Sequence, residues 1–365
     1  MPQKLYILIG TRPNFIKVTQ FKRFTSEALE ITIIHTGQHY DKNMADVFFE
    51  QFGLQPDHFL NIAPGSPVSQ MADIMKGLEA FILQNGTPDV LMVPGDVNST
   101  LAGALVANKM NIKLAHLESG LRSFDREMPE EINRILTDEL ADYYFVTEPS
   151  GEKHLREEGK HGKICYVGNT MIDTLVHYEP QIEASTILDE LGLTDKPFVL
   201  ITLHRPSNVD SKEGIERMIR LLESLSQDYK TVFPVHPRTM KRTEEFGLKD
   251  QLEAIDNFIN VPPLGYFEFQ KLVKHCAFVI TDSGGIQEET TFRQVPCLTL
   301  RENTERPITC EIGTNTLVPF DLEILNDYIK QIEQGTYKSG EIPELWDGGA
   351  TGRILDELRI ENFNN

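Results

Sequence analysis

The chain has little of what marks secreted proteins and zinc proteins. Its 365 residues include only four cysteines, and no two of them form a C-x-x-C pair. That spacing argues against a disulfide framework and against a zinc site, because both need grouped cysteines. The four are Cys165, Cys276, Cys297 and Cys310. Since Cys276 and Cys297 lie within or beside apolar runs, we expect buried thiols.

Long apolar runs and positive charge are also scarce. The run nearest the N-terminus, residues 5–9, is too short for a signal peptide, and no run approaches the ~20 residues of a membrane-spanning helix. The chain has 35 lysines and arginines against 55 aspartates and glutamates, a formal net charge of −20. Such a chain lacks the basic surface that binds nucleic acids and anionic membranes. We therefore expect a soluble cytoplasmic protein with no nucleic-acid or membrane partner.

Short apolar runs recur along the whole chain, separated by segments with helical periodicity. Most of these runs are unbroken rather than alternating, which is typical of strands buried on both faces of a parallel sheet. The predicted strands are residues 5–9, 31–35, 90–93, 113–117, 143–146, 163–167, 198–203, 231–235, 258–261, 278–281 and 297–300. The alternation with helices predicts an α/β fold of doubly wound units.

The two halves of the chain resemble each other. "LYILIGTRP" and "FVLITLHRP" are both strands that end in a basic residue and a proline, and "DVLMVPGD" and "FVITDSGG" both end in a glycine turn with an acid. We predict two Rossmann-like domains, residues 1–175 and 176–350, with the boundary in the polar stretch 178–196. A C-terminal helix within residues 351–365 is expected to pack back on the N-terminal domain. Ligands of such sheets bind beyond the carboxyl ends of the strands, so the polar residues there are the site candidates.

Several of the chain's few cations stand at predicted strand ends. Arg12 ends the first strand, and Lys17 lies one turn into the helix that Pro13 opens. The others, from "LHRP", "VHPR" and "ENTERP", are His204, Arg205, His236, Arg238 and Arg306. Each one alone is more often a surface cation or part of a salt bridge. Together they indicate a site for an anion such as a diphosphate.

The stretch "FVITDSGGIQEET" contains a strand, a turn at Ser283, Gly284 and Gly285, and the start of a helix. Glycines let the backbone approach a ligand closely, and a helix N-terminus offers unpaired N–H groups with partial positive charge. The ordinary alternative is a plain strand–helix turn. Glu289 on this helix is a candidate acceptor for ribose hydroxyls, or else a solvated helix residue. Phe269 could stack on a base, although core packing is the default for an aromatic residue there.

Acidic residues follow three predicted elements of the first half. Asp96 comes after the strand at 90–93, and Glu118 ends the next strand, so neighbouring parallel strands would bring both carboxylates to one edge. Glu130 and Glu131 open a helix whose predicted apolar face is Ile132, Ile135, Leu136 and Leu140. In the ordinary interpretation, Asp96 caps a helix and the glutamates complement the helix dipole. Three acids near one diphosphate site instead indicate acid–base catalysis.

Nine motifs resemble, in this order, those of non-hydrolysing UDP-N-acetylglucosamine 2-epimerases. They are "GTRPNFIK", "GQHY", "GDVNST", "HLESGLRS", "MPEEINR", "HRP", "PVHPR", "TDSGGIQEE" and "ENTERP". The resemblance implies a GT-B-like fold, with two Rossmann-like domains whose parallel sheets face a central cleft, and a homodimer with no NAD or metal cofactor. It implies reversible conversion of UDP-N-acetylglucosamine to UDP-N-acetylmannosamine for surface polysaccharide precursors. UDP is eliminated to leave 2-acetamidoglucal and is then added back.

The resemblance also implies residue roles by motif position. The catalytic set is Asp96, Glu118, Glu130 and His204. The substrate-binding set is Arg12, Lys17, His236, Phe269, Ser283, Gly284, Gly285, Glu289 and Arg306. Within it, Glu289 is the ribose partner and Phe269 the uracil-side aromatic. We expect Asp96 or Glu118 to serve the C2 face of the sugar, while Glu130 and His204 assist proton movement and departure of UDP.

The chain departs from the family pattern in places. Many bacterial members read "GDTTTT", "EAGLRT" and "HRREN" where this chain has "GDVNST", "ESGLRS" and "HRPSN". Asp41 stands where members activated by a second substrate molecule have a glutamine, which argues against such activation.

The substrate and the reaction class have competing hypotheses. The stretch "HTGQHYDKNMADVFFEQFG" also resembles relatives acting on UDP-2,3-diacetamido-glucuronic acid, which is the second candidate substrate. A GT-B glycosyltransferase or a non-catalytic UDP-sugar-binding regulator would share the nucleotide site, but neither needs all three acids. A hydrolysing epimerase, which releases free N-acetylmannosamine and UDP, is a further variant.

Overall fold

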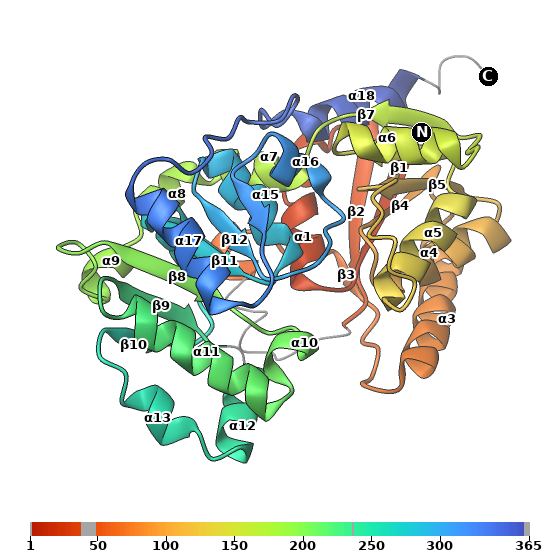
Figure 1. Cartoon of the computed structure of the whole chain (residues 1–365). Helices are drawn as coiled ribbons and strands as arrows, with labels where there is room; N and C mark the ends of the chain where they lie inside the picture. The colour runs from red at the N-terminus through yellow and green to blue at the C-terminus, as the bar shows by residue number, and fades with distance from the viewer. Residues whose placement is uncertain (1, 38–48, 236, 361–365) are drawn as a thin grey trace. The chain divides into compact units, whose positions relative to one another are not determined.

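The computed structural model describes residues 2–37, 49–235 and 237–360. The chain forms two compact units, one of Met1–His177 with Glu344–Asn365 and the other of Tyr178–Pro343. Each unit has one parallel sheet with helices packed on both of its faces (Figure 1). The prediction of two Rossmann-like α/β units is confirmed. Among the described residues, no helix is both long and apolar enough to cross a membrane.

The sheet of the first unit has seven strands in the order β3-β2-β1-β4-β5-β6-β7. Their bounds are β1 Gln3–Ile9, β2 Leu29–His35, β3 His58–Phe59, β4 Val90–Pro94, β5 Lys113–Leu117, β6 Tyr143–Val146 and β7 Lys163–Tyr166. The short β3 was not predicted, because its two residues belong to no apolar run. The strand order reverses between β1 and β4, and ligands of doubly wound sheets bind at that switch point. Arg12, Lys17 and Asp96 follow these two strands.

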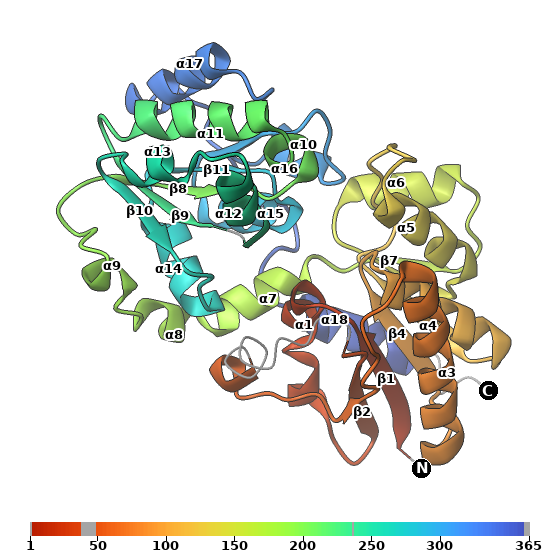
Figure 2. The same cartoon turned by 90° about the horizontal axis from the view of Figure 1, so that it is seen from below.

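The helices of the first unit lie in two layers. Those whose bounds lie within the described residues are α1 Arg12–Val18, η1 Phe21–Phe24, α3 Pro67–Asn85, α4 Asn98–Lys109, α5 Pro129–Leu140, α6 Pro149–Glu157, α7 Thr170–His177 and α18 Ala350–Ile360. Figure 2 shows α3 and α4 side by side on one face of the sheet, while α1, α7 and α18 are grouped on the other. Leu8 and Val93 of the sheet pack against Ile74 and Leu78 of α3 in the core between these layers.

The apolar face predicted for α5 is wrong. Leu136 is 45% exposed, while Glu131, Arg134 and Asp138 are at most 2% exposed. The helix therefore buries a polar side. These buried groups are tolerated because each is paired or hydrogen-bonded to a neighbouring segment. Apolar spacing alone cannot reveal such partners.

The second unit has a six-stranded sheet in the order β10-β9-β8-β11-β12-β13. The strands are β8 Phe198–Thr202, β9 Lys230–Pro234, β10 Phe258–Val261, β11 Phe278–Thr281, β12 Cys297–Thr299 and β13 Asn315–Leu317. The short polar β13 was not predicted. The helices are α8 Glu179–Glu183, α9 Ile187–Glu190, α10 Pro206–Val209, α11 Lys212–Leu225, α12 Pro237–Glu245, α13 Lys249–Glu253, α14 Tyr266–His275, α15 Gly284–Arg293, α16 Pro307–Glu311 and α17 Leu322–Glu333. Apolar residues of α11 and α17 cover one face of the sheet, and those of α14 and α15 cover the other.

The C-terminal segment returns to the first unit. The indole of Trp346 is buried and donates to the Thr147 carbonyl at 2.9 Å. The Asp173 carboxylate in α7 accepts hydrogen bonds from the first two N–H groups of α18, those of Ala350 at 3.0 Å and Thr351 at 2.6 Å. Asp173 therefore acts as a cap supplied by a distant part of the chain, because these N–H groups have no partner within their own helix.

We predict that Asp173→Ala weakens the first unit by about 1–2 kcal/mol, since a helix cap contributes roughly that much. Urea unfolding followed by the fluorescence of Trp346, the single tryptophan, measures this loss. Asp356→Ala is the matched control, because Asp356 lies on the same helix with its side chain 74% exposed. It should change the free energy of unfolding by less than about 0.5 kcal/mol. Equal effects of the two substitutions would contradict the capping role.

Candidate active site

Asp96 and Glu118 follow the carboxyl ends of neighbouring strands, as predicted. β4 and β5 pair in parallel with Pro94 opposite Leu117. The Gly95 N–H then donates to the Leu117 carbonyl at 2.9 Å, which extends this pairing by one residue. The two carboxylates thus follow neighbouring strands, at the edge where such sheets bind ligands.

Glu118 has an unusual backbone and a buried partner. Its φ is +70°, in the left-handed region that residues other than glycine rarely adopt, and such strain clusters at functional sites. Its carboxylate forms an ion pair with the Lys17 ammonium, and both side chains are less than 10% exposed. A side chain on Gly95 would begin 3.3 Å from Lys17 Nζ, so the glycine leaves room for this pair.

Asp96 is held by α5. The buried Arg134 guanidinium pairs with the Asp96 carboxylate through Nη2 and with Glu131 Oε2 through Nη1 at 2.6 Å. Asn133 donates from its amide to the Asp96 backbone carbonyl at 2.9 Å. The interpretation that Asp96 caps α4 is wrong, because the N-cap residue is Val97 and no side chain caps it. Sequence reasoning missed Arg134, although its position three residues after Glu131 is typical of a helical ion pair.

The two neighbouring glutamates of α5 differ in their surroundings. Glu131 accepts hydrogen bonds from Ser123 N at 2.9 Å, Ser123 Oγ at 3.0 Å and Phe124 N at 3.0 Å, so it fixes the loop before the helix. This is more than the helix-dipole role considered for it. Glu130, the predicted catalytic residue, is exposed and forms no ion pair with any described residue. Arg12 is likewise exposed, at the start of α1.

In the second unit, the glycine turn is packed against a cation. Ser283 is the N-cap of α15, but its side chain makes no capping hydrogen bond. A Cβ on Gly284 would lie 2.9 Å from Arg306 Nη1 and 3.1 Å from Glu305 Oε1, so only glycine fits without displacing these groups. Arg306 is buried and pairs with Glu288 at 2.9 Å and with Glu305 at 2.8 Å. Gly285 lies in the first turn of α15, which begins two residues earlier than expected.

His204 follows β8 and is oriented by Asp282. Its Nδ1 lies 2.9 Å from Asp282 Oδ1, and the same buried carboxylate accepts from the backbone N–H groups of His204 and Arg205 at 3.0 and 2.9 Å. Burial alone would raise the pKa of Asp282, but its contacts with His204, Asn208 and the Arg205 N–H together outweigh burial and lower it. The His204 side chain is 45% exposed. His236, like Gln38 and Asp41, lies outside the described residues.

Glu289 and Phe269 lie on the helices α15 and α14. Glu289 is 5% exposed, and burial raises its pKa to about 7 against the opposing effects of Gln270 and Arg293. Phe269 is partly buried and packs against the apolar core of its unit. A carboxyl group with such a raised pKa is a frequent feature of functional sites.

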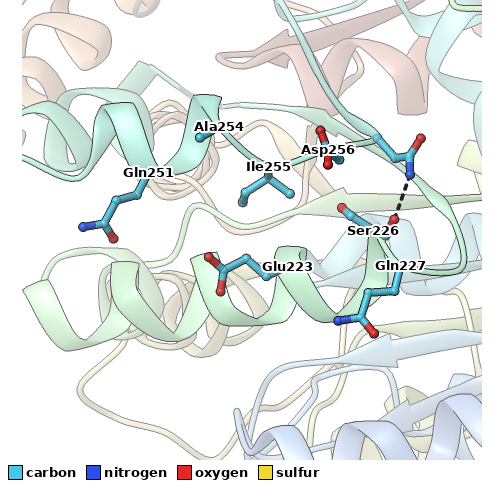
Figure 3. A pocket seen from close by; sticks show the side chains of 8 residues that line it. Glu223, Ser226, Gln227, Gln251, Ala254, Ile255 and Asp256 are labelled. Carbon is cyan, nitrogen blue, oxygen red and sulfur yellow. Dashed lines mark hydrogen bonds between the residues drawn. The ribbon is translucent and has the colours of Figure 1, made fainter.

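A separate hollow of about 640 Å³ lies in the second unit, where Glu223 of α11 and Gln251 of α13 line it (Figure 3). Asn257 and Ser226, joined by a hydrogen bond of 2.9 Å, precede β10 and β9. This hollow is therefore at the amino ends of the strands, opposite the edge that carries Ser283. Ligands of doubly wound sheets bind at the carboxyl ends, so the hollow is not a candidate active site.

Comparison with known proteins covers nearly the whole chain. A family model described as UDP-N-acetylglucosamine 2-epimerase matches residues 22–359. A crystal structure of Methanocaldococcus jannaschii UDP-GlcNAc 2-epimerase in complex with UDP-GlcNAc and UDP matches with a TM-score of 0.87 and 40% identity, over 98% of this chain and 100% of that one. The UDP-2,3-diacetamido-2,3-dideoxy-D-glucuronate 2-epimerase of Pseudomonas aeruginosa is 39% identical over 97% of this chain and 99% of its own.

A more distant match concerns the fold alone. A crystal structure of MurG from Acinetobacter baumannii matches with a TM-score of 0.59 and 12% identity, over 98% of this chain and 100% of that one. The GT-B-like fold expected from the motifs is confirmed.

We predict that Glu289→Gln stabilises the unliganded protein in a pH-dependent way. The folded carboxyl titrates at about 7 instead of 4.5, so between these values the folded state holds an extra proton, and stability falls as pH rises. At about pH 8 the variant should exceed wild type by on the order of 3 kcal/mol, and at about pH 4, below both pKa values, the difference should nearly vanish. Urea unfolding followed by circular dichroism measures it.

The control for this prediction is Glu253→Gln, in the same unit, where the side chain is 55% exposed. Its stability should follow that of wild type at both pH values. A Glu289→Gln variant with no gain at alkaline pH would show that the Glu289 carboxyl is not destabilised by burial.

Proposed function

The chain belongs to the UDP-N-acetylglucosamine 2-epimerase family, and on that premise we propose that it interconverts UDP-N-acetylglucosamine and UDP-N-acetylmannosamine by inverting C2. The observation that carries the proposal is the pair Asp96 and Glu118, which follow neighbouring strands and are each paired with a buried cation. Exchange of a proton at C2 needs such positioned groups, because a C–H bond is a weak acid.

In the proposed reaction, Asp96 or Glu118 takes the proton from C2. The electrons of the C2–H bond form the C1–C2 double bond of 2-acetamidoglucal, and those of the C1–O bond leave with UDP. A proton is then delivered to the opposite face of C2 while a UDP oxygen rejoins C1. Atoms and electrons balance without NAD or another redox partner. Glu130 and His204 are proposed to assist the proton movement and the departure of UDP.

The second unit is proposed to bind UDP. The N-terminus of α15 carries a partial positive charge, and the Ser283 side chain leaves its N–H groups uncapped. Arg306 packs against Gly284 at that helix start, where Glu288 and Glu305 hold its guanidinium in place. Both features favour a diphosphate. Glu289 is the proposed ribose partner and Phe269 the proposed uracil contact. The remaining proposed ligands are Arg12, Lys17, His236 and Gly285.

A related UDP-amino sugar is the second candidate substrate. The Pseudomonas relative, named for UDP-2,3-diacetamido-2,3-dideoxy-D-glucuronate, is about as similar to this chain as the Methanocaldococcus structure is. Inversion at C2 would use the same carboxylates on either sugar. UDP-N-acetylglucosamine is preferred because the family model carries that name. A homodimer, a cytoplasmic location, catalysis without a metal and a role in supplying surface polysaccharide precursors are proposed from family membership alone.

Proton NMR of the purified protein with UDP-N-acetylglucosamine in D₂O tests the function. We expect UDP-N-acetylmannosamine signals to appear and deuterium to enter at C2, because the proton removed is replaced from solvent. Asp96→Asn should slow deuterium entry by about 100-fold or more, which is the usual contribution of a positioned acid–base group. The same measurement of deuterium entry on Glu118→Gln tests the other carboxylate.

Three outcomes would change this proposal. Free N-acetylmannosamine would indicate a hydrolysing enzyme. Turnover of only the diacetamido-glucuronate substrate would move the proposal to the second candidate. Wild-type deuterium exchange in both carboxylate variants would remove Asp96 and Glu118 from the catalytic set.

We predict that Gly284→Ala weakens UDP binding about tenfold, a change of about 1.4 kcal/mol. The new methyl group would meet the Arg306 guanidinium at 2.9 Å. Because Glu288 and Glu305 hold that guanidinium, it cannot move aside freely. Calorimetric titration with UDP measures the affinity.

The matched control is Gly352→Ala. Gly352 also lies within a helix, α18, but a Cβ there would meet only Phe24, at 4.0 Å. UDP affinity should equal that of wild type. If the two alanine variants bind UDP equally well, the diphosphate does not lie at the start of α15.

A further inference from the structure

His116 lies in β5, two residues before Glu118, and is fully buried. Both of its ring nitrogens face acceptors. Nε2 lies 2.8 Å from the Gly95 carbonyl oxygen, and Nδ1 lies 2.6 Å from Asp138 Oδ1. A carbonyl oxygen can only accept, so Nε2 must carry a hydrogen. The protonation of Nδ1 then depends on whether Asp138 is ionised.

The surroundings of Asp138 keep it ionised. Arg122 Nη1 lies 2.7 Å from its second oxygen, and the Gly120 N–H donates to that oxygen at 3.2 Å. Burial opposes ionisation, but both of these groups donate to the oxygen and the guanidinium is permanently charged, so they favour the carboxylate whatever the state of His116. Arg122 also pairs with Glu158 at 2.8 Å. Glu158 also pairs with Lys160 at 3.5 Å, so it has a cation of its own, and the groups that face Asp138 directly are Arg122, the Gly120 N–H and the His116 ring.

The ring holds the backbone that carries Asp96. Gly95 has a φ of +69° and is bound at both ends by β5, through its N–H to the Leu117 carbonyl and through its own carbonyl to His116. A Cβ on Gly95 would lie 3.3 Å from Lys17 Nζ and 3.9 Å from Glu118 Oε2. Any shift of this turn would therefore move Asp96 and crowd the pair of Lys17 with Glu118.

We propose that His116 is a positioning residue, an imidazolium clamped between Asp138 and the Gly95 carbonyl that sets Asp96 beside Glu118. Its role in turnover rests on the proposed function, whereas its charge state does not. The ordinary alternative is a neutral core histidine. A neutral ring has one donor, so it would satisfy the Gly95 carbonyl but present a lone pair to the Asp138 carboxylate. The charged and neutral rings differ in one proton at Nδ1.

Long-range ¹H–¹⁵N NMR of protein labelled with ¹⁵N-histidine tests the charge. We expect both nitrogens of one histidine to give protonated-type signals at about pH 7–8, where an exposed ring would be neutral. Loss of these signals in His116→Gln assigns them. In Asp138→Asn, we expect the ring to become neutral with one unprotonated nitrogen. An unprotonated nitrogen at His116 in wild type, or a doubly protonated ring in Asp138→Asn, would overturn the proposal.

Kinetics test the positioning role. His116→Gln should lower kcat about 100-fold, because a small misplacement of a catalytic group has that cost. KM and UDP affinity should stay within about twofold, since the proposed UDP ligands of the second unit are unaltered. His154→Gln is the matched control, because His154 Nδ1 also contacts a backbone carbonyl, that of Gly120 at 2.9 Å. The kcat of this variant should stay near that of wild type.

Each kinetic outcome is decisive. Wild-type kcat in His116→Gln, or an equal loss in His154→Gln, would refute the positioning role. A His116→Gln protein that fails to fold leaves the decision to the ring signals of wild type and Asp138→Asn. If wild type epimerises no UDP-amino sugar, the proposed function fails, while the NMR result still decides the charge of His116.

Discussion

The site of the first unit depends on the buried ion pair between Lys17 and Glu118. Lys17 belongs to α1, which follows β1, and Glu118 follows β5, while β4 lies between these strands in the sheet. Gly95 at the end of β4 leaves the space in which the two side chains meet. A buried charge without its partner is strongly destabilising. Three segments of the chain therefore have to be placed together before either charge is tolerated.

The same requirement explains the polar side of α5. Arg134 bridges Asp96 and Glu131, and Asp138 joins His116 to Arg122, so the helix is attached to the sheet edge mainly by charge pairs. Such contacts add little net stability, because desolvation offsets much of the attraction. Their geometric precision suits the proposed reaction, in which these carboxylates would exchange protons. Apolar packing is supplied elsewhere, by α3 and α4.

The candidate site of the second unit differs from that of the first in the groups that form it. Its candidate site is built mainly from backbone groups, because the Ser283 side chain does not cap the N–H groups at the start of α15. The Arg306 guanidinium packs against Gly284 at the same helix start. Asp282, buried beside this turn, orients His204 through the side chain and the backbone at once. Its sheet edge therefore suits an anion, whereas the edge of the first unit suits proton transfer. This division matches the two requirements of a reaction that moves a proton and releases a diphosphate.

The sequence by itself determined the eleven predicted strands, all of which are present, and the placement of Asp96 and Glu118 at the ends of adjacent ones. It also carried the motifs of the family. Only the tertiary structure decided which charges meet, which side of α5 is buried, and where the short strands β3 and β13 form. The reason is physical. An apolar run or a helical period is a local property of the chain, whereas the partner of a buried charge comes from a distant segment and leaves no periodic trace.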